Sequence, residues 1–443
     1  MLHITRAAAL AAVAGCAVVS AASVPVNLLF QEGDAVDGST ISSVNAAFTS
    51  GGGTVGSLGI LEDGRRFIWI NNGVAFTSDM GIDTISGGES TIGVADDGSW
   101  DASFSLPPRA GTGSGSDDSW YHSSNQTIAR ELDPYPFIPN QVVGFASRPT
   151  MDDEGTAYVV GGYREDDGSN SGSDGRAFWR STDPASGTYE VVYESFEVID
   201  GFTVGNGGVD FTYDVSGNGD WLVTEIVFND TPTPQDDNMV YLIDLNNPAN
   251  KPRLGRETDP TGNGDNYDNW DGVKVNNNGD VLIHGDTNGA SAADEFITYT
   301  GNFVYNEGDV IGGLGLEAVA AADIDDAGRL VAVFDVGTSS SDEVLVFGSD
   351  AGDNSTWETI LRVGDDLDFD DNGSIDGVLE DFNISGFSNP FEIGNGNVVW
   401  LEIDYLPTGG GASLEAIIGV TIPAPGALAV LGLGGLAAVR RRR

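Results

Sequence analysis

A short turn-and-strand pattern recurs along the 443 residues and constrains the fold more than any other feature of the sequence. Each copy has an acidic or Asn-rich turn that contains a glycine, followed by a run of β-branched, aliphatic and aromatic residues. Asp or Asn next to Gly is typical of a tight turn with positive φ, and the run after it has the composition of a strand. Seven turns carry the pattern, at Gly64, Gly98, Gly155, Gly219, Gly279, Gly328 and Gly396. Each copy therefore predicts a hairpin that leads into a buried strand.

Further strands follow most copies of the turn. A second aromatic or aliphatic strand occurs at 239–243, 295–299 and 343–347, and a third strand that ends in an acidic turn occurs at 303–305 and 359–363. A period of about 50–65 residues with several strands per unit is typical of propeller blades. No segment outside the two chain ends has a sustained helical period, so the body is predicted to be all-β.

The two ends of the repeat array indicate how it closes. Residues 27–34 match the third strand of a unit, whereas the last unit has its first strand at 398–403, its second at 414–418, and no third. One unit is thus divided between the two ends, which is the arrangement that a closed ring needs. We predict a β-propeller over residues 23–420, closed by the N-terminal strand and most simply seven-bladed. Six blades are the alternative, because the unit between Gly64 and Gly98 is short; the divided unit argues against an open solenoid or two β-sandwiches.

The chain ends have the composition of processing signals. Residues 1–22 combine Arg6, an apolar stretch and small residues at 20–22, which predicts a secretory signal peptide. Cys16 could instead be the lipidated residue of a lipobox. Residues 421–443 contain an apolar run, predicted to be a helix, that is followed by Arg440–Arg443; a permanent membrane anchor is one interpretation of it.

Two parts of the sequence resemble known families. Pro423-Ala424-Pro425, the apolar run at 427–439 and the terminal arginines are similar to the PEP-CTERM sorting signal, with Ala424 where that motif has Glu. The resemblance implies a protein exported by a Gram-negative bacterium, handled by the export machinery and by an exosortase-like sorting enzyme, and placed at the cell surface or outside the cell. The body, best at 276–283 and 325–332, resembles the NxxGxxAF-type tandem-repeat proteins, a family without assigned chemistry.

The charge balance excludes several classes of partner. There are 68 Asp and Glu against 19 Lys and Arg, a formal net charge of −49, so nucleic acid and anionic lipid are disfavoured. Contact with the membrane is expected only through the C-terminal segment. A single Cys leaves neither an internal disulfide framework nor a Cys-rich zinc site.

One loop has the spacing of a calcium site. Oxygen-bearing side chains stand at alternate positions around Gly373, and they are Asp368, Asp370, Asn372, Ser374 and Asp376. This matches the start of an EF-hand-type loop, in which the glycine permits the sharp turn. Leu379 stands where the bidentate Glu belongs, and Glu380 and Asp381 lie just beyond it. The loop is therefore either a calcium site with borrowed distal ligands or a solvated acidic turn.

Signals for catalysis are sparse. Outside the signal peptide only His122 and His284 are histidines, and His284 is expected to follow a core strand as a satisfied blade residue. No nucleophile motif or phosphate loop is found, and no cofactor-binding residue is assigned. Several aromatic residues could stack on sugars or pack the blades: Trp120, Tyr121, Trp179, Trp270 and Trp357. We predict a non-enzymatic surface protein that binds polysaccharide or protein; the alternative is a secreted glycosidase or lyase that acts on polysaccharide.

Overall fold

The computed structural model describes most of the repeat body. The described residues are 26–78, 84–85, 91–107, 117–166, 173–232, 237–262, 264–290, 293–337, 339–384, 392–394 and 397–422. The predicted signal peptide with Cys16, and the predicted C-terminal helix and sorting segment from 423 onward, lie outside them.

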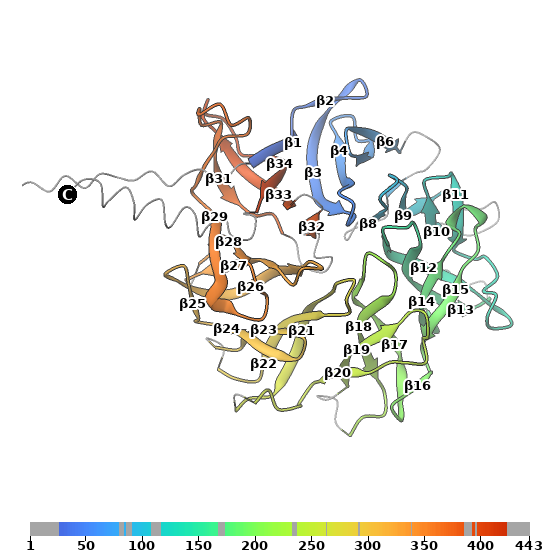
Figure 1. The fold of residues 1–443 in the computed structure, drawn as a ribbon. Helices are drawn as coiled ribbons and strands as arrows, with labels where there is room; N and C mark the ends of the chain where they lie inside the picture. The colour runs from blue at the N-terminus through green and yellow to red at the C-terminus, as the bar shows by residue number, and fades with distance from the viewer. Residues whose placement is uncertain are drawn as a thin grey trace, which may run out of the picture.

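These residues form seven antiparallel sheets arranged as a ring, which is a seven-bladed β-propeller (Figure 1). The prediction of an all-β propeller with seven blades is confirmed, and six blades are excluded. Sheets of this size close into a ring by packing face to face with both neighbours.

The strands of each blade follow one another in the chain. Blade 1 comprises β2 (Ala35–Val36), β3 (Ser39–Thr49), β4 (Val55–Leu61), β5 (Arg66–Ile70) and β6 (Gly73–Thr77). Blade 2 comprises β7 (Thr84–Ile85), β8 (Ile92–Val94), β9 (Trp100–Leu106), β10 (Asp117–His122) and β11 (Gln126–Arg130). Blade 3 comprises β12 (Gln141–Met151), β13 (Ala157–Glu165), β14 (Gly175–Ser181), the 3₁₀ turn η1 (Pro184–Ser186) and β15 (Glu190–Glu194).

The next three blades repeat this order. Blade 4 comprises β16 (Val198–Ile199), β17 (Phe202–Val215), β18 (Trp221–Phe228), β19 (Asn238–Asp244) and β20 (Arg253–Arg256). Blade 5 comprises β21 (Tyr267–Val275), β22 (Val281–Thr287), β23 (Glu295–Tyr299) and β24 (Asn302–Asn306). Blade 6 comprises β25 (Val310–Ile311), β26 (Leu314–Ile324), β27 (Leu330–Val336), β28 (Ser339–Gly348), η2 (Asn354–Thr356) and β29 (Trp357–Arg362).

Blade 7 joins the two ends of the described chain. It comprises β30 (Asp366–Leu367), β31 (Gly377–Asp381), β32 (Glu392–Gly394), β33 (Val398–Pro407), β34 (Leu414–Thr421) and, from the N-terminal side, β1 (Val26–Gln31). β1 pairs antiparallel with β34, from Val26 opposite Val420 to Gln31 opposite Ala416. In Figure 1 the blue β1 lies beside the red β34. The predicted closure by the N-terminal strand is therefore confirmed.

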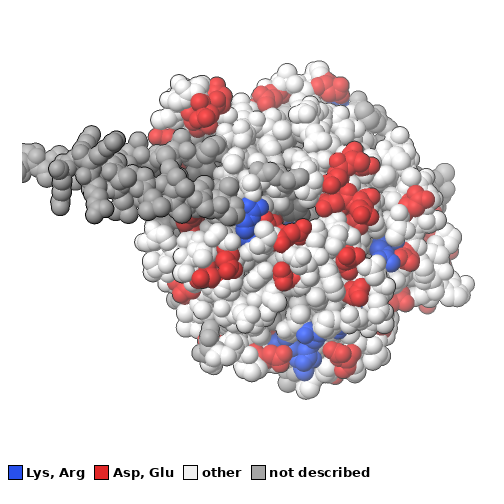
Figure 2. Space-filling model, viewed as in Figure 1, with Lys and Arg blue, Asp and Glu red and all other residues white. Residues whose placement is uncertain are grey.

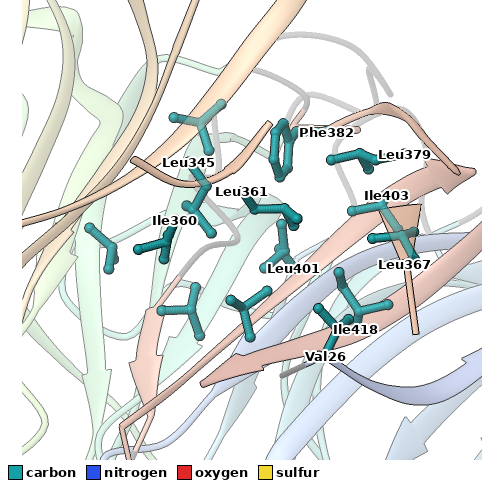
Figure 3. Packing of buried hydrophobic residues seen from close by; sticks show 14 of the residues in the cluster. Val26, Leu345, Ile360, Leu361, Leu367, Leu379, Phe382, Leu401, Ile403 and Ile418 are labelled. Carbon is teal, nitrogen blue, oxygen red and sulfur yellow. The ribbon is translucent and has the colours of Figure 1, made fainter. Parts of the chain in front are cut away.

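The hydrophobic core lies between neighbouring blades. The largest cluster fills the space between blades 6 and 7, where Leu345 and Ile360 of blade 6 pack with Leu401 and Ile418 of blade 7 (Figure 3). Val26 of β1 belongs to the same cluster, so the closing strand contributes to the core as well as to the strand pairing. Burial of both sheet faces explains why a second strand such as β27 is a nearly continuous apolar run.

The recurring turn joins the innermost strand of a blade to the second strand. In blades 5 and 6 it contains Gly279 (φ 79°) and Gly328 (φ 72°), as the turn chemistry predicts. The innermost strand precedes the turn, and the three-strand unit predicted from the sequence omits it.

In blade 1 the predicted hairpin turn at Gly64 is present, but it is not the inner turn. Gly64 lies in the turn between β4 and β5, whereas the inner turn of blade 1 is formed by Ser50 to Gly53. This turn has glycines because two carboxylates from other turns approach it closely. A Cβ on Gly52 would lie 2.2 Å from Asp96 Oδ1, and one on Gly51 would lie 2.4 Å from Asp153 Oδ2.

Candidate functional site

The inner turns of blades 1 to 6 are linked by hydrogen bonds around the propeller axis, and we call them the turn ring. The turns of blades 2 to 6 each use an Asp, an Asn or a backbone carbonyl to accept an N–H from the turn of the preceding blade. The donor–acceptor pairs are Gly52 N to Asp96 Oδ1 (2.6 Å), Asp96 N to Asp153 O (3.1 Å), Asp153 N to Gly217 O (2.8 Å), Asn218 N to Asn277 Oδ1 (2.6 Å) and Asn277 N to Asp326 Oδ1 (2.8 Å). The acidic turns of the sequence therefore hold one end of the axial channel together.

The turn ring surrounds a polar cavity of about 430 Å³, which we call the mouth. Its wall includes Asp153, Asn277, Asp326 and the ion pair between Arg329 and Asp325. Arg329 Nε donates to Asp325 Oδ2 at 2.6 Å, and its guanidinium also donates to Asn397 of blade 7. These side chains offer hydrogen-bond donors and acceptors at a rigid rim.

A second, smaller cavity lies on the axis. It measures about 80 Å³, and its wall includes Arg148, Tyr213, Asp271 and His284. The Arg148 guanidinium lies 4.7 Å from the centre of the Phe211 ring and donates to the Phe211 carbonyl at 3.1 Å. Cation–π contact and hydrogen bonding together fix this buried arginine in the wall. Ligand pockets for drug-sized molecules are several times larger than this cavity.

Three carboxylates meet in blade 5 beside the small cavity, and we call them the blade 5 triad. Asp271 lies in a β-bulge of β21, Asp286 lies on β22, and Glu295 lies opposite Asp286 on β23. One carboxylate oxygen from each lies within 4.8 Å of the others. The pKa of Asp271 is raised to about 6, that of Glu295 to about 8, and that of Asp286 also rises, in each case because of burial first and neighbouring carboxylates second.

Blades 6 and 7 repeat part of this arrangement. Asp335 lies opposite Glu343 in blade 6, and Asp404 lies opposite Glu415 in blade 7. In all three blades the Glu accepts a backbone N–H from the following blade: Val319 N to Glu295 (3.5 Å), Phe382 N to Glu343 (3.0 Å) and Val44 N to Glu415 (2.7 Å). Some of the excess acidic side chains therefore form hydrogen bonds between neighbouring blades. Acidic side chains also outnumber basic ones over the face viewed in Figure 2.

The two histidines of the body differ in their surroundings. The structure places His284 within β22 rather than after it, with 3 % of its surface exposed. Neither ring nitrogen has a hydrogen-bond partner among the described residues, so the expectation of a satisfied residue is wrong. Burial, with the Lys274 charge second, lowers the pKa of His284 to about 4. His122, in contrast, shares a hydrogen bond of 2.9 Å with Ser124 Oγ.

The predicted calcium loop connects β30 to β31. Carboxylate oxygens of Asp368, Asp370 and Asp376 lie within 4.8 Å of one another, so the structure brings three of the five predicted ligands together. Asn372 Oδ1 accepts the Ser374 N–H at 2.8 Å. Leu379 is buried in the core between blades 6 and 7.

The aromatic residues singled out from the sequence pack the blades. Trp120 and Trp179 are fully buried, and Tyr121, Trp270 and Trp357 are each less than 10 % exposed. Of the two interpretations, blade packing is the one that the structure shows.

Sequence reasoning missed the blade 5 triad because its members come from three strands. Only the strand register brings Asp271 and Glu295 together, and Asp271 reaches the group through a bulge. The V-x-x-x-x-D spacing of the second strands, seen at Asp286 and Asp404, is the signal that could have indicated it.

No helix among the described residues is long and apolar enough to cross a membrane.

Comparisons with known proteins give likenesses in structure alone. No protein-family model matches the sequence, and neither does any curated protein. A protein of unknown function from Dyadobacter fermentans matches with a TM-score of 0.38 and 12 % identity, over 87 % of this chain and all of that one. Prolyl oligopeptidase B from Galerina marginata matches with a TM-score of 0.44 and 10 % identity, over 84 % of this chain and 49 % of that one. An α-L-arabinanase from Penicillium chrysogenum, complexed with arabinobiose, matches with a TM-score of 0.38 and 10 % identity, over 74 % of this chain and 92 % of that one. The propeller assignment itself rests on the strand pairing described above.

Proposed function

We propose that this chain is an exported, non-enzymatic propeller that binds a polysaccharide or protein partner at the mouth. The observation that carries the proposal is the polar cavity of about 430 Å³ inside the turn ring. Its carboxylates already have structural partners: Asp325 is paired with Arg329, and Asp326 accepts from Asn277. A preformed polar rim of this kind recognises hydroxyl and amide groups without reorganisation.

Export follows from the two processing signals predicted at 1–22 and 421–443. We place the protein at the cell surface or outside the cell, with a transient inner-membrane stage before an exosortase-like enzyme acts on the C-terminal segment. A net charge of −49 keeps such a protein soluble and makes its surface attract cations.

A bulky side chain in the mouth is expected to abolish binding. Ala327 is exposed in the inner turn of blade 6 and lines the mouth, so Ala327→Trp fills the cavity without removing a hydrogen bond. We expect a polysaccharide identified on a glycan array to lose at least tenfold in affinity for this variant. Ala35→Trp, at an exposed position on β2, is the matched control and should bind like the wild type. Equal binding by both variants would place the ligand elsewhere.

Calcium is proposed to stabilise the loop at 368–376. Carboxylates are hard oxygen ligands that suit this ion, and Asp368, Asp370 and Asp376 are the residues that would hold it. Asn372 and Ser374 complete the predicted set.

Millimolar calcium is therefore expected to raise the melting temperature, since a ligand present at 100 times its Kd stabilises the folded state by about 2.7 kcal/mol. Asp370→Asn should abolish the rise, while Asp371→Asn, one residue along and outside the carboxylate group, should keep it. Differential scanning calorimetry with calcium and with a chelator makes the measurement. No shift in the wild-type protein would identify the loop as a solvated acidic turn.

Cleavage of polysaccharide is the second candidate function. It is favoured by the raised pKa values of Asp271 and Glu295 beside the axis, because general acids work with such values. The adjoining cavity of about 80 Å³ is small for a saccharide ring, which is why binding at the mouth is preferred. Release of reducing ends or unsaturated products from a bound glycan would establish catalysis.

A further inference from the structure

The outermost strand of every blade has a bulge at the same place. Where this strand pairs with its neighbour, the register shifts by one residue in all seven blades. In six blades the residue that follows the bulge has a buried side chain, and these residues are Phe30, Phe76, Ala129, Tyr193, Tyr305 and Leu361. In blade 4 the same position is Gly255. Blade 4 therefore lacks a core side chain that its counterparts supply.

A pocket of about 230 Å³ lies at this position, and we call it the interblade pocket. It is formed by blades 4 and 5, which are neighbours in the ring (Figure 1). Leu242, Leu254 and Gly255 line it from blade 4, and Tyr267 and Trp270 line it from blade 5. A Cβ on Gly255 would lie 2.9 Å from Trp270 Cη2, so the glycine also lets the indole ring approach. Protein interiors keep few voids of this size, which is why we relate the pocket to the missing side chain.

The wall of the interblade pocket is apolar and uncharged. Among the described residues that line it there is no Asp, Glu, Lys, Arg or His. Apart from Tyr267, its side-chain hydroxyls belong to Thr298 and Thr300, and the Thr298 hydroxyl donates to the Ile283 carbonyl at 3.5 Å. A charged ligand would lose its hydration there without gaining a partner, and a saccharide would leave most of its hydroxyls unpaired. The wall therefore selects against ions and sugars.

The aromatic part of the wall indicates the class of ligand. The ring centres of Tyr267 and Trp270 are 4.8 Å apart with their planes tilted by 40°, and both rings also pack against Phe296. Rings in such a cluster favour offset or edge contacts with a further aromatic ring. An engineered apolar cavity of about 150 Å³ binds benzene, so a pocket of about 230 Å³ accommodates a larger ring system.

We propose that the interblade pocket binds one free, uncharged aromatic molecule of about the size of indole. Leu254 is 39 % exposed and Gly301 is also exposed, so the pocket opens to the surface. Its lining residues differ from those of the mouth and of the small axial cavity. The site is therefore independent of the function proposed for the mouth.

A titration with indole, followed by calorimetry and by the melting temperature, tests the site. Leu242→Trp fills the pocket with the variant's own ring, and Leu254→Trp covers its opening, so both should lose at least tenfold in affinity for indole. Leu254→Trp keeps the test decisive if Leu242→Trp does not fold. Leu406→Trp in blade 7 is the matched control, because Leu406 is 37 % exposed, and it should bind indole like the wild type. No binding by the wild type, or equal binding by all three variants, would overturn the site.

Two related compounds test the chemistry and the source of the ligand. Tryptamine carries the indole ring with a positive charge, which the net charge of −49 attracts to the surface of the protein. Binding inside the pocket predicts that tryptamine binds at least tenfold more weakly than indole, and equal or tighter binding would overturn the assignment to the pocket. N-acetyltryptophanamide represents a tryptophan side chain of a partner protein and should also bind more weakly. Tighter binding of this compound than of indole would overturn the assignment to a free molecule.

Discussion

Replacing Phe30 by alanine is expected to destabilise the folded propeller by about 3–5 kcal/mol, the usual cost of deleting a large buried aromatic side chain. Phe30 lies on β1 and is 2 % exposed. Its ring centre is 4.8 Å from that of Trp69 and 6.2 Å from that of Phe67 in blade 1. Phe30 therefore couples the closing strand to the first blade as well as to the last, and its loss leaves a cavity at the seam of the ring.

Denaturant unfolding followed by tryptophan fluorescence measures this effect. Asn27→Ala is the matched control, because Asn27 lies on the same strand with its side chain exposed. Its cost should stay within about 0.5 kcal/mol, as is usual for surface substitutions. If the two variants unfolded at the same denaturant concentration, the seam would not depend on β1 packing.

Stability is expected to fall as the pH rises from about 5 to 8. Burial, followed by neighbouring negative charge, raises the pKa of Glu402 to about 8 from an ordinary value of 4.5 and also raises the pKa of Glu343. Between these pH values the folded state holds protons that the unfolded state has released. The free energy of unfolding therefore decreases with rising pH, by up to about 1.4 kcal/mol per pH unit for each such carboxyl.

Glu402→Gln tests the sign of this dependence. Glu402 accepts the Ala46 N–H at 2.5 Å, and a glutamine amide oxygen keeps that acceptor while removing the titration. The variant should lose part of the decline in melting temperature between pH 5 and 8 in chelator-containing buffer. Glu62→Gln, at an exposed turn, is the control for the loss of one charge and should follow the wild type. A wild-type melting temperature that rises over this range would contradict the prediction.

The blade count and the closure could be predicted because their signals are local or repetitive. The turn at Gly279 needs positive φ, which glycine adopts without strain, and similar chemistry marks most of the other inner turns. The innermost strands escaped prediction because bulges interrupt their alternation. β21, for example, shifts register between Tyr267 and Asn269 and again between Trp270 and Gly272.

The candidate sites also differ in whether their residues lie close together in the sequence. The loop at 368–376 could be predicted because its ligands are neighbours in sequence, and the structure brings three of the five together. The blade 5 triad depends on the register of three strands, and the mouth depends on turns from different blades. Residues that lie far apart in the sequence leave no periodic pattern, so these groups become visible only in the folded ring.

The pairing of β1 with β34 also sets an order of events. The partners Val26 and Val420 stand at opposite ends of the body, so the ring cannot close until the last blade has been synthesised. Contacts of such long sequence separation slow folding, because the entropy of closing the loop is lost before the contact forms. The seam between β1 and β34 is therefore expected to be the last part of the ring to form.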